Sequence, residues 1–211
     1  MDMISGLRKS AVALAAGAGF FLVASQAQAV VVFNVVSLPI ALTGNGLYLN
    51  VITGVINEPG NGLGTTVAGW DINPYGTTDL RFFSATPSAS SGYVGVGTAY
   101  TNLAPGASIS AASTFLNTTA PQPAANWNLN STNNFVGFRF LNEFNGQVHY
   151  GYFRLSLGAT TTTGRSIVAY AYENVPGAPI LAGAIPEPST YALMGLGLAG
   201  LMVAARRRKQ A

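Results

Sequence analysis

The chain offers few side chains that can perform acid–base, nucleophilic or metal chemistry. Cysteine is absent, and His149 is the single histidine among 211 residues. Lysine occurs at positions 9 and 209 alone. These counts exclude disulfides, thiolate catalysis, cysteine-ligated metals and multi-histidine centres within one chain. They also leave the middle of the chain without a lysine nucleophile. We therefore expect no catalytic residue, no resident metal and no cofactor.

His149 is the residue best suited to act as a general base. A serine hydrolase would need it, but the chain contains no G-x-S-x-G sequence. Strand alternation places His149 on one face with Phe153, Leu155 and Leu157, so we expect a core or hairpin-end histidine bonded to the backbone. The acidic residues between positions 30 and 183 are scattered and predict no carboxylate pair. An enzyme that uses His149 with one of these acids is the alternative.

A second candidate is the segment 71–79, which partly matches a calcium-binding loop. Asp71, Asn73 and Asp79 supply oxygen at positions 1, 3 and 9, and glycine stands at position 6. Position 5 is Tyr75 and position 12 is Phe82, so the bidentate acid of an EF-hand loop is missing. The pattern predicts an Asx turn, with calcium binding as the alternative.

Tyrosines are the third candidate feature. Tyr150 and Tyr152 alternate along one predicted strand, as Tyr170 and Tyr172 do along another. An outward row of such rings could stack on sugars. The alternative, which we favour, is that the loop 121–134 covers this sheet face and that the tyrosines are core residues.

The elements that must position these side chains are β-strands. Residues 30–183 are rich in Thr, Asn, Ser, Gly, Val and aromatics, and period-two alternation is frequent. We expect an all-β sandwich or jelly-roll-like domain. Asn145-Gly146 is the strongest hairpin signal, and 121–134 is predicted to be a long loop. The predicted strands are 30–38, 46–56, 66–73, 80–84, 92–100, 135–141, 148–157 and 167–173.

Charge is concentrated at the two ends of the chain. Charged residues make up 8%, and the net charge of +3 is the balance of ten basic and seven acidic residues. Between positions 30 and 183, four arginines and five acids give −1. This middle region has no basic stripe that could neutralise phosphates, so nucleic acid is excluded as the main partner.

The N-terminal residues 1–29 have the organisation of a secretory signal peptide. Arg8 and Lys9 precede an apolar run over 11–24, and Ala27-Gln28-Ala29 supplies an A-x-A cleavage site. We expect signal peptidase to cleave after Ala29, so that Val30 becomes the mature N-terminus. A buried N-terminal helix is the alternative, although the run has no polar face.

The C-terminal residues 184–211 contain a second apolar segment. Residues 191–205 carry no charge and would span roughly 22 Å as a helix, which is a short transmembrane helix. The basic cluster that follows should stay in the cytoplasm and place the middle of the chain on the outer side. This stop-transfer cluster consists of Arg206, Arg207, Arg208 and Lys209.

Directly before the apolar segment stand Pro186, Glu187 and Pro188. The order Pro-Glu-Pro, short apolar helix and arginine cluster resembles the PEP-CTERM sorting signal of Gram-negative bacteria. The resemblance implies recognition of Pro186, Glu187 and Pro188 by an exosortase, transient anchoring in the membrane, and transfer to the cell surface or extracellular space. Such proteins are often associated with exopolysaccharide. A plain single-pass anchor is the alternative.

The block 134–157 and the later Ala171-Tyr172-Glu173 are similar to a β-domain of exported PEP-CTERM proteins, a resemblance that implies no chemistry. We therefore expect the mature domain, residues 30–183, to be structural, adhesive or matrix-associated and not an enzyme. A carbohydrate-binding module that uses Tyr150 and Tyr152 and associates with exopolysaccharide is the alternative.

Overall fold

The computed structural model describes residues 30–57, 66–186 and 197–198, and in this part of the chain the fold is all-β, as predicted. The predicted signal helix lies outside the described residues, as does the predicted membrane helix 191–205 apart from the helical residues 197 and 198. None of the helices in the described ranges has the length and apolar character needed to span a bilayer. The elements are β1 (Val31–Pro39), β2 (Ile72–Tyr75), β3 (Arg81–Ser84), β4 (Gly92–Val96), β5 (Ala99–Tyr100), β6 (Ser108–Ile109), β7 (Phe115–Leu116), the 3₁₀ helix η1 (Ala124–Asn126), β8 (Ser131–Asn142), β9 (Gln147–Leu157), β10 (Ser166–Glu173) and β11 (Ile180–Leu181).

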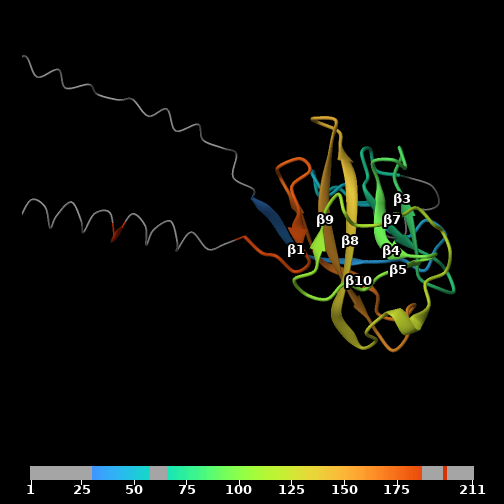
Figure 1. Ribbon diagram of the computed structural model, residues 1–211. Helices are drawn as coiled ribbons and strands as arrows, with labels where there is room; N and C mark the ends of the chain where they lie inside the picture. The colour runs from blue at the N-terminus through green and yellow to red at the C-terminus, as the bar shows by residue number, and fades with distance from the viewer. Residues whose placement is uncertain (1–29, 58–65, 187–196, 199–211) are drawn as a thin grey trace, which may run out of the picture.

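One large antiparallel sheet organises the domain (Figure 1). Its strand order is β1-β10-β9-β8-β4-β5, and β7 also pairs with β4. The N-terminal strand β1 pairs with β10, the last long strand, so the two ends of the domain meet in one sheet. The long strands β8, β9 and β10 form its centre and carry the side chains of the candidate site.

The β8–β9 hairpin turns at Asn145-Gly146, as predicted. Gly146 has φ of 66°, a left-handed conformation that favours glycine, and its N–H donates to the Asn142 carbonyl. Farther along the hairpin, Gly151 faces Phe138 across the strand pair. A Cβ at Gly151 would lie 2.5 Å from the Phe138 ring, so the glycine is required for this close packing.

The two faces of the sheet have separate hydrophobic cores, because alternate residues of β8, β9 and β10 point in opposite directions. The first core contains Phe138, Phe140, Phe153 and Leu155, and the small sheet β2–β3 covers it with Phe82. The second contains Tyr150 and Tyr152 and is covered by residues of β6, β7 and β11. The architecture is one large sheet with the β2–β3 pair in the core on one face and the β6–β11 pair in the core on the other. The described residues form no second large sheet of the kind that a jelly roll has.

Several predicted strands differ from the observed elements. The segment 46–56 forms only isolated bridges at Leu49 and Ile56, because the Asn50 side chain accepts the N–H groups of Ile52 and Thr53 and makes a turn there. The segment 92–100 is a hairpin of β4 and β5 with Gly97 in its turn. Of the predicted strand 66–73, only residues 72 and 73 lie in a strand, β2. The two-residue strands β6, β7 and β11 are too short to show periodicity.

Candidate functional site

His149 is a core histidine, as predicted. It is 1% exposed, stacks on Phe140 and holds the hairpin to β10. Its Nδ1 lies 2.8 Å from the backbone oxygen of Glu173, and its Nε2 lies 3.2 Å from Nδ2 of Asn145. A carbonyl oxygen only accepts, so Nδ1 donates to it and Nε2 accepts from the amide. Both ring nitrogens therefore have structural partners, and His149 has no free nitrogen to act as a base.

Tyr150 and Tyr152 are buried, with exposed fractions of 6% and 1%. Tyr150 stacks on Phe115, and Tyr152 packs edge-on against Phe135. Burial raises the pKa of Tyr152 to about 12, and its hydroxyl donates to the Ala184 carbonyl at 2.6 Å. The prediction of an outward tyrosine row for sugar stacking is therefore wrong, and the favoured alternative of core tyrosines is confirmed.

The predicted cover of these tyrosines is different in the structure. Phe115 and the β6–β11 pair lie over them. The loop 121–134 instead inserts Trp127 into the first core and ends in the start of β8. Gln122 in this loop accepts the Tyr100 N–H, which fixes the loop beside β5.

The guanidinium of Arg165 packs against the calcium-like segment 71–79 and donates to its backbone carbonyls. Arg165 is 4% exposed, and its guanidinium donates to carbonyl oxygens on two segments. Burial lowers the pKa of Arg165, and the oxygens compensate the charge that burial disfavours. The five acceptors lie at 2.5–3.5 Å and are the carbonyls of Ile40, Ala41, Tyr75, Gly76 and Asp79.

The side chains of the calcium pattern also point to separate partners. Asp79 forms an ion pair with Arg81 at 2.8 Å, and this hydrogen bond lowers the pKa of Asp79. Asp71 accepts the Val51 N–H at 2.8 Å from the other end of the segment. Asn73 donates to the carbonyls of Asn45 and Leu47. The predicted calcium alternative is therefore not supported, because these ligands do not converge.

The structure places two acids near one another that the sequence pattern did not connect. Burial raises the pKa of Asp71 to about 8, and the charge of Glu143 adds to this rise. The side-chain amide of Asn50 donates to Glu143 Oε1 at 2.6 Å and to the Ala68 carbonyl at 3.1 Å. Asp71 is only 5% exposed, which leaves little of its carboxyl for a substrate.

Within the described ranges, no three His, Asp or Glu side chains form a group that could hold a metal ion.

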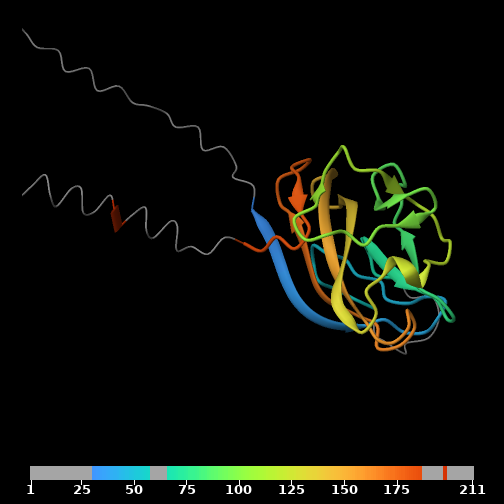
Figure 2. The ribbon, with the colours of Figure 1, turned by 60° about the horizontal axis from the view of Figure 1, so that its bottom comes forward.

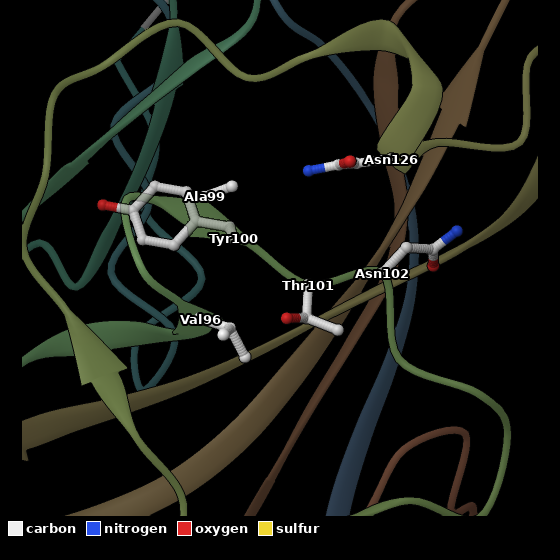
Figure 3. A pocket seen from close by; sticks show the side chains of 6 residues that line it. All are labelled: Val96, Ala99, Tyr100, Thr101, Asn102 and Asn126. Atoms are coloured by element: carbon white, nitrogen blue, oxygen red, sulfur yellow. The ribbon is translucent and has the colours of Figure 1, made fainter.

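An open cavity of about 320 Å³ lies between the β4–β5 hairpin and η1. Figure 3 shows the side chains of Thr101, Asn102 and Asn126 at its polar side and those of Val96 and Ala99 at its apolar side. Asn102 is already bonded to Asn134 and to the Phe135 N–H. The lining contains amide, hydroxyl and apolar groups without a charged side chain, which suits a neutral polar ligand. Sequence reasoning missed this cavity, because its residues come from a turn and a loop without a motif.

The two ends of the described domain leave it on the same side, beside β1 (Figures 1 and 2). At the N-terminal end, Val30 is hydrogen-bonded to Glu173 and Asn174 at the end of β10. At the C-terminal end, Ala184 is held by Tyr152, and the next residue, Ile185, is 60% exposed. The segment that follows the domain therefore begins at an accessible position.

Comparison with known proteins identifies this segment. A family model described as the PEP-CTERM protein-sorting motif matches residues 184–209. The resemblance seen in the sequence is thus confirmed, and the motif supports exosortase-dependent sorting of an exported protein to the cell surface or extracellular space. No curated protein and no solved structure matches the chain.

Proposed function

We propose that the chain is a precursor in a Gram-negative bacterium, cleaved by signal peptidase after Ala29 and then anchored transiently by residues 191–205. An exosortase recognises Pro186, Glu187 and Pro188 and releases the domain to the outer surface or extracellular matrix. The observation that carries this proposal is the sorting motif at 184–209, at the point where the folded domain ends. Ile185 and Pro186 are exposed, so a membrane enzyme can reach them without unfolding the domain.

The test replaces Pro186, Glu187 and Pro188 by alanine in the native host. We expect an unprocessed precursor that stays in the membrane fraction, since the extended segment recognised by the enzyme is lost. Immunoblots of membrane and extracellular fractions measure this. Ile185→Ala is the matched control, because Ile185 is exposed and adjacent to the motif. Normal processing of the triple variant would contradict exosortase recognition.

We propose further that the mature domain is structural, adhesive or matrix-associated and not catalytic. Support comes from the candidate residues themselves. The ring nitrogens of His149 are engaged by Glu173 and Asn145, and Asp71 is buried against Val51. Activity on a panel of glycosides and esters that is lost in His149→Ala, while the fold is kept, would contradict this proposal.

A second candidate is binding of a neutral polysaccharide, and the cavity beside η1 favours it. Asn126 and Thr101 offer an amide and a hydroxyl to sugar hydroxyls, and Val96 offers an apolar contact. The probe is exopolysaccharide purified from the host. We expect Asn126→Ala to weaken its binding roughly tenfold, the effect of one or two hydrogen bonds. Asn133→Ala is the control, since that side chain is exposed and outside the cavity. Equal binding by both variants would remove this candidate.

A further inference from the structure

Glu173, the last residue of β10, is a buried acid without a cationic side chain paired to it in the described part of the chain. It is 2% exposed. The ion pair found in the described part of the chain joins Arg81 and Asp79, so no described arginine or histidine side chain pairs with Glu173. The nearby His149 contacts the backbone carbonyl of Glu173 and not its carboxylate. A buried carboxylate is costly unless a charge or several hydrogen bonds compensate it.

Two backbone N–H groups, those of Val30 and Val175, donate to the Glu173 carboxylate. The Val30 nitrogen lies 2.9 Å from Oε1 of Glu173 and 3.0 Å from Oδ1 of Asn174. The Val175 N–H also donates to the same Glu173 oxygen at 3.1 Å. A peptide N–H has one hydrogen, which these two acceptors must share. An α-ammonium has three hydrogens and a positive charge, so it can satisfy both acceptors separately.

The backbone holds this nitrogen in place independently of its charge. Val31 pairs with Glu173 in the β1–β10 ladder, and the Asn174 N–H donates to the Val30 carbonyl at 3.2 Å. Val30 is therefore positioned by the sheet directly beside the carboxylate. It is also the residue that the sequence predicts to become the mature N-terminus.

We propose that removal of the signal peptide completes a partly buried ion pair between the new α-ammonium of Val30, a residue that is 48% exposed, and the buried carboxylate of Glu173. This inference rests on the proposed export and cleavage after Ala29. Hydrolysis of the Ala29–Val30 bond consumes one water, leaves a carboxylate on Ala29 and an amine on Val30, and the amine takes up a proton. The precursor has a neutral amide at the same place. Processing thus stabilises the start of β1, which in the described part of the chain is an edge strand paired with β10.

The first experiment compares residues 30–211 with residues 29–211, both purified in detergent. One has Val30 as its free N-terminus, and the other carries the natural Ala29 in front of it, which converts the Val30 amine into an amide. We expect the free form to melt about 5 °C higher, and we expect Glu173→Gln to abolish this difference. Equal melting temperatures, or a difference that persists in Glu173→Gln, would overturn the proposal.

The second experiment uses the scarcity of amines in the mature chain. Residues 30–211 contain two amines, the Val30 α-amine and Lys209. The reactive form of an amine is the neutral one, and a neighbouring carboxylate favours the protonated form, so an amine-reactive reagent should modify Val30 about tenfold more slowly in the wild type than in Glu173→Gln. Lys209 serves as the internal standard. An unchanged ratio would refute the ion pair, whereas a native mature N-terminus other than Val30 would refute the predicted cleavage site without affecting either in vitro result.

Discussion

Arg165 and Glu173 are buried charges at opposite ends of the same strand, β10, and the protein compensates them differently. Arg165 directly precedes the strand and donates to five carbonyl oxygens of the segments 40–41 and 75–79. Glu173 ends the strand and depends on N–H donors at Val30 and Val175. Arg165 is satisfied by carbonyl oxygens of two loops, whereas Glu173 depends in part on the first residue of the domain, Val30.

The two groups are compensated at different stages, Arg165 when the domain folds and Glu173 when the signal peptide is removed. The Arg165 guanidinium joins the loops at one end of the sheet as soon as the domain folds. The Glu173 carboxylate gains its cation only when the chain acquires a free N-terminus at Val30. Asp71 illustrates a third solution, because burial raises its pKa to about 8 and the carboxyl remains protonated at neutral pH. The three buried ionisable groups predict three different responses to mutation.

The largest effect is expected from Arg165→Met. The variant removes the donors of five carbonyl oxygens in a buried place, so we expect a loss of about 4 kcal/mol in the free energy of unfolding. Arg165→Lys should recover part of this loss, because a lysine keeps the charge but not the planar fork. Urea denaturation of residues 30–211 measures both.

Arg154→Met is the matched control for this prediction. Arg154 lies on β9, is half-buried and has a buried Nε without a hydrogen-bond partner in the described part of the chain. Its replacement should change the free energy of unfolding by less than about 1 kcal/mol. Similar losses for Arg154→Met and Arg165→Met would show that the carbonyl contacts are not the source of the stability.

An intermediate effect is expected from Asp71, and it depends on pH. The carboxyl ionises near pH 4 when the chain is unfolded, but holds its proton to about pH 8 in the folded chain. Between these values the folded state binds one more proton, so its stability falls as the pH rises. We expect wild type to lose about 3 kcal/mol relative to Asp71→Asn between pH 5 and pH 8. Parallel urea-denaturation profiles for the two proteins would contradict the buried, protonated carboxyl.

The smallest effect is expected from Glu173→Gln. Glutamine keeps the shape and one acceptor but removes the charge, so we expect a loss of about 1.5 kcal/mol in the form with a free Val30 amine. The loss should be smaller in the form that begins at Ala29. Chemical denaturation of both forms gives the comparison, and a loss of the same size in each would mean that the N-terminal charge makes no contribution.

Much of the central sheet could be predicted from the sequence. Period-two alternation and the Asn145-Gly146 turn located β8, β9 and β10, because long strands with buried faces leave a strong pattern. Alternation also placed His149 correctly among core residues. The sorting motif was recognisable because its three elements are contiguous in the chain.

Other features depend on contacts between distant segments. The five acceptors of Arg165 are backbone oxygens, which leave no trace in residue type. The proximity of Val30 to Glu173 follows from the β1–β10 pairing over 143 residues. Alternation showed that Tyr150 and Tyr152 share a face, but a single sheet can bury both faces, so the pattern could not tell which side faces solvent.

We propose that both ends of this chain are removed in the cell and that the β-domain is left at the surface. Mass spectrometry of the intact protein isolated from native cells tests it most directly. We expect a mature chain that begins at Val30 and ends at or near Pro186-Glu187-Pro188, without the segment 191–205. A protein that retains residues 1–29, or one that still ends at Ala211 after reaching the surface, would contradict it.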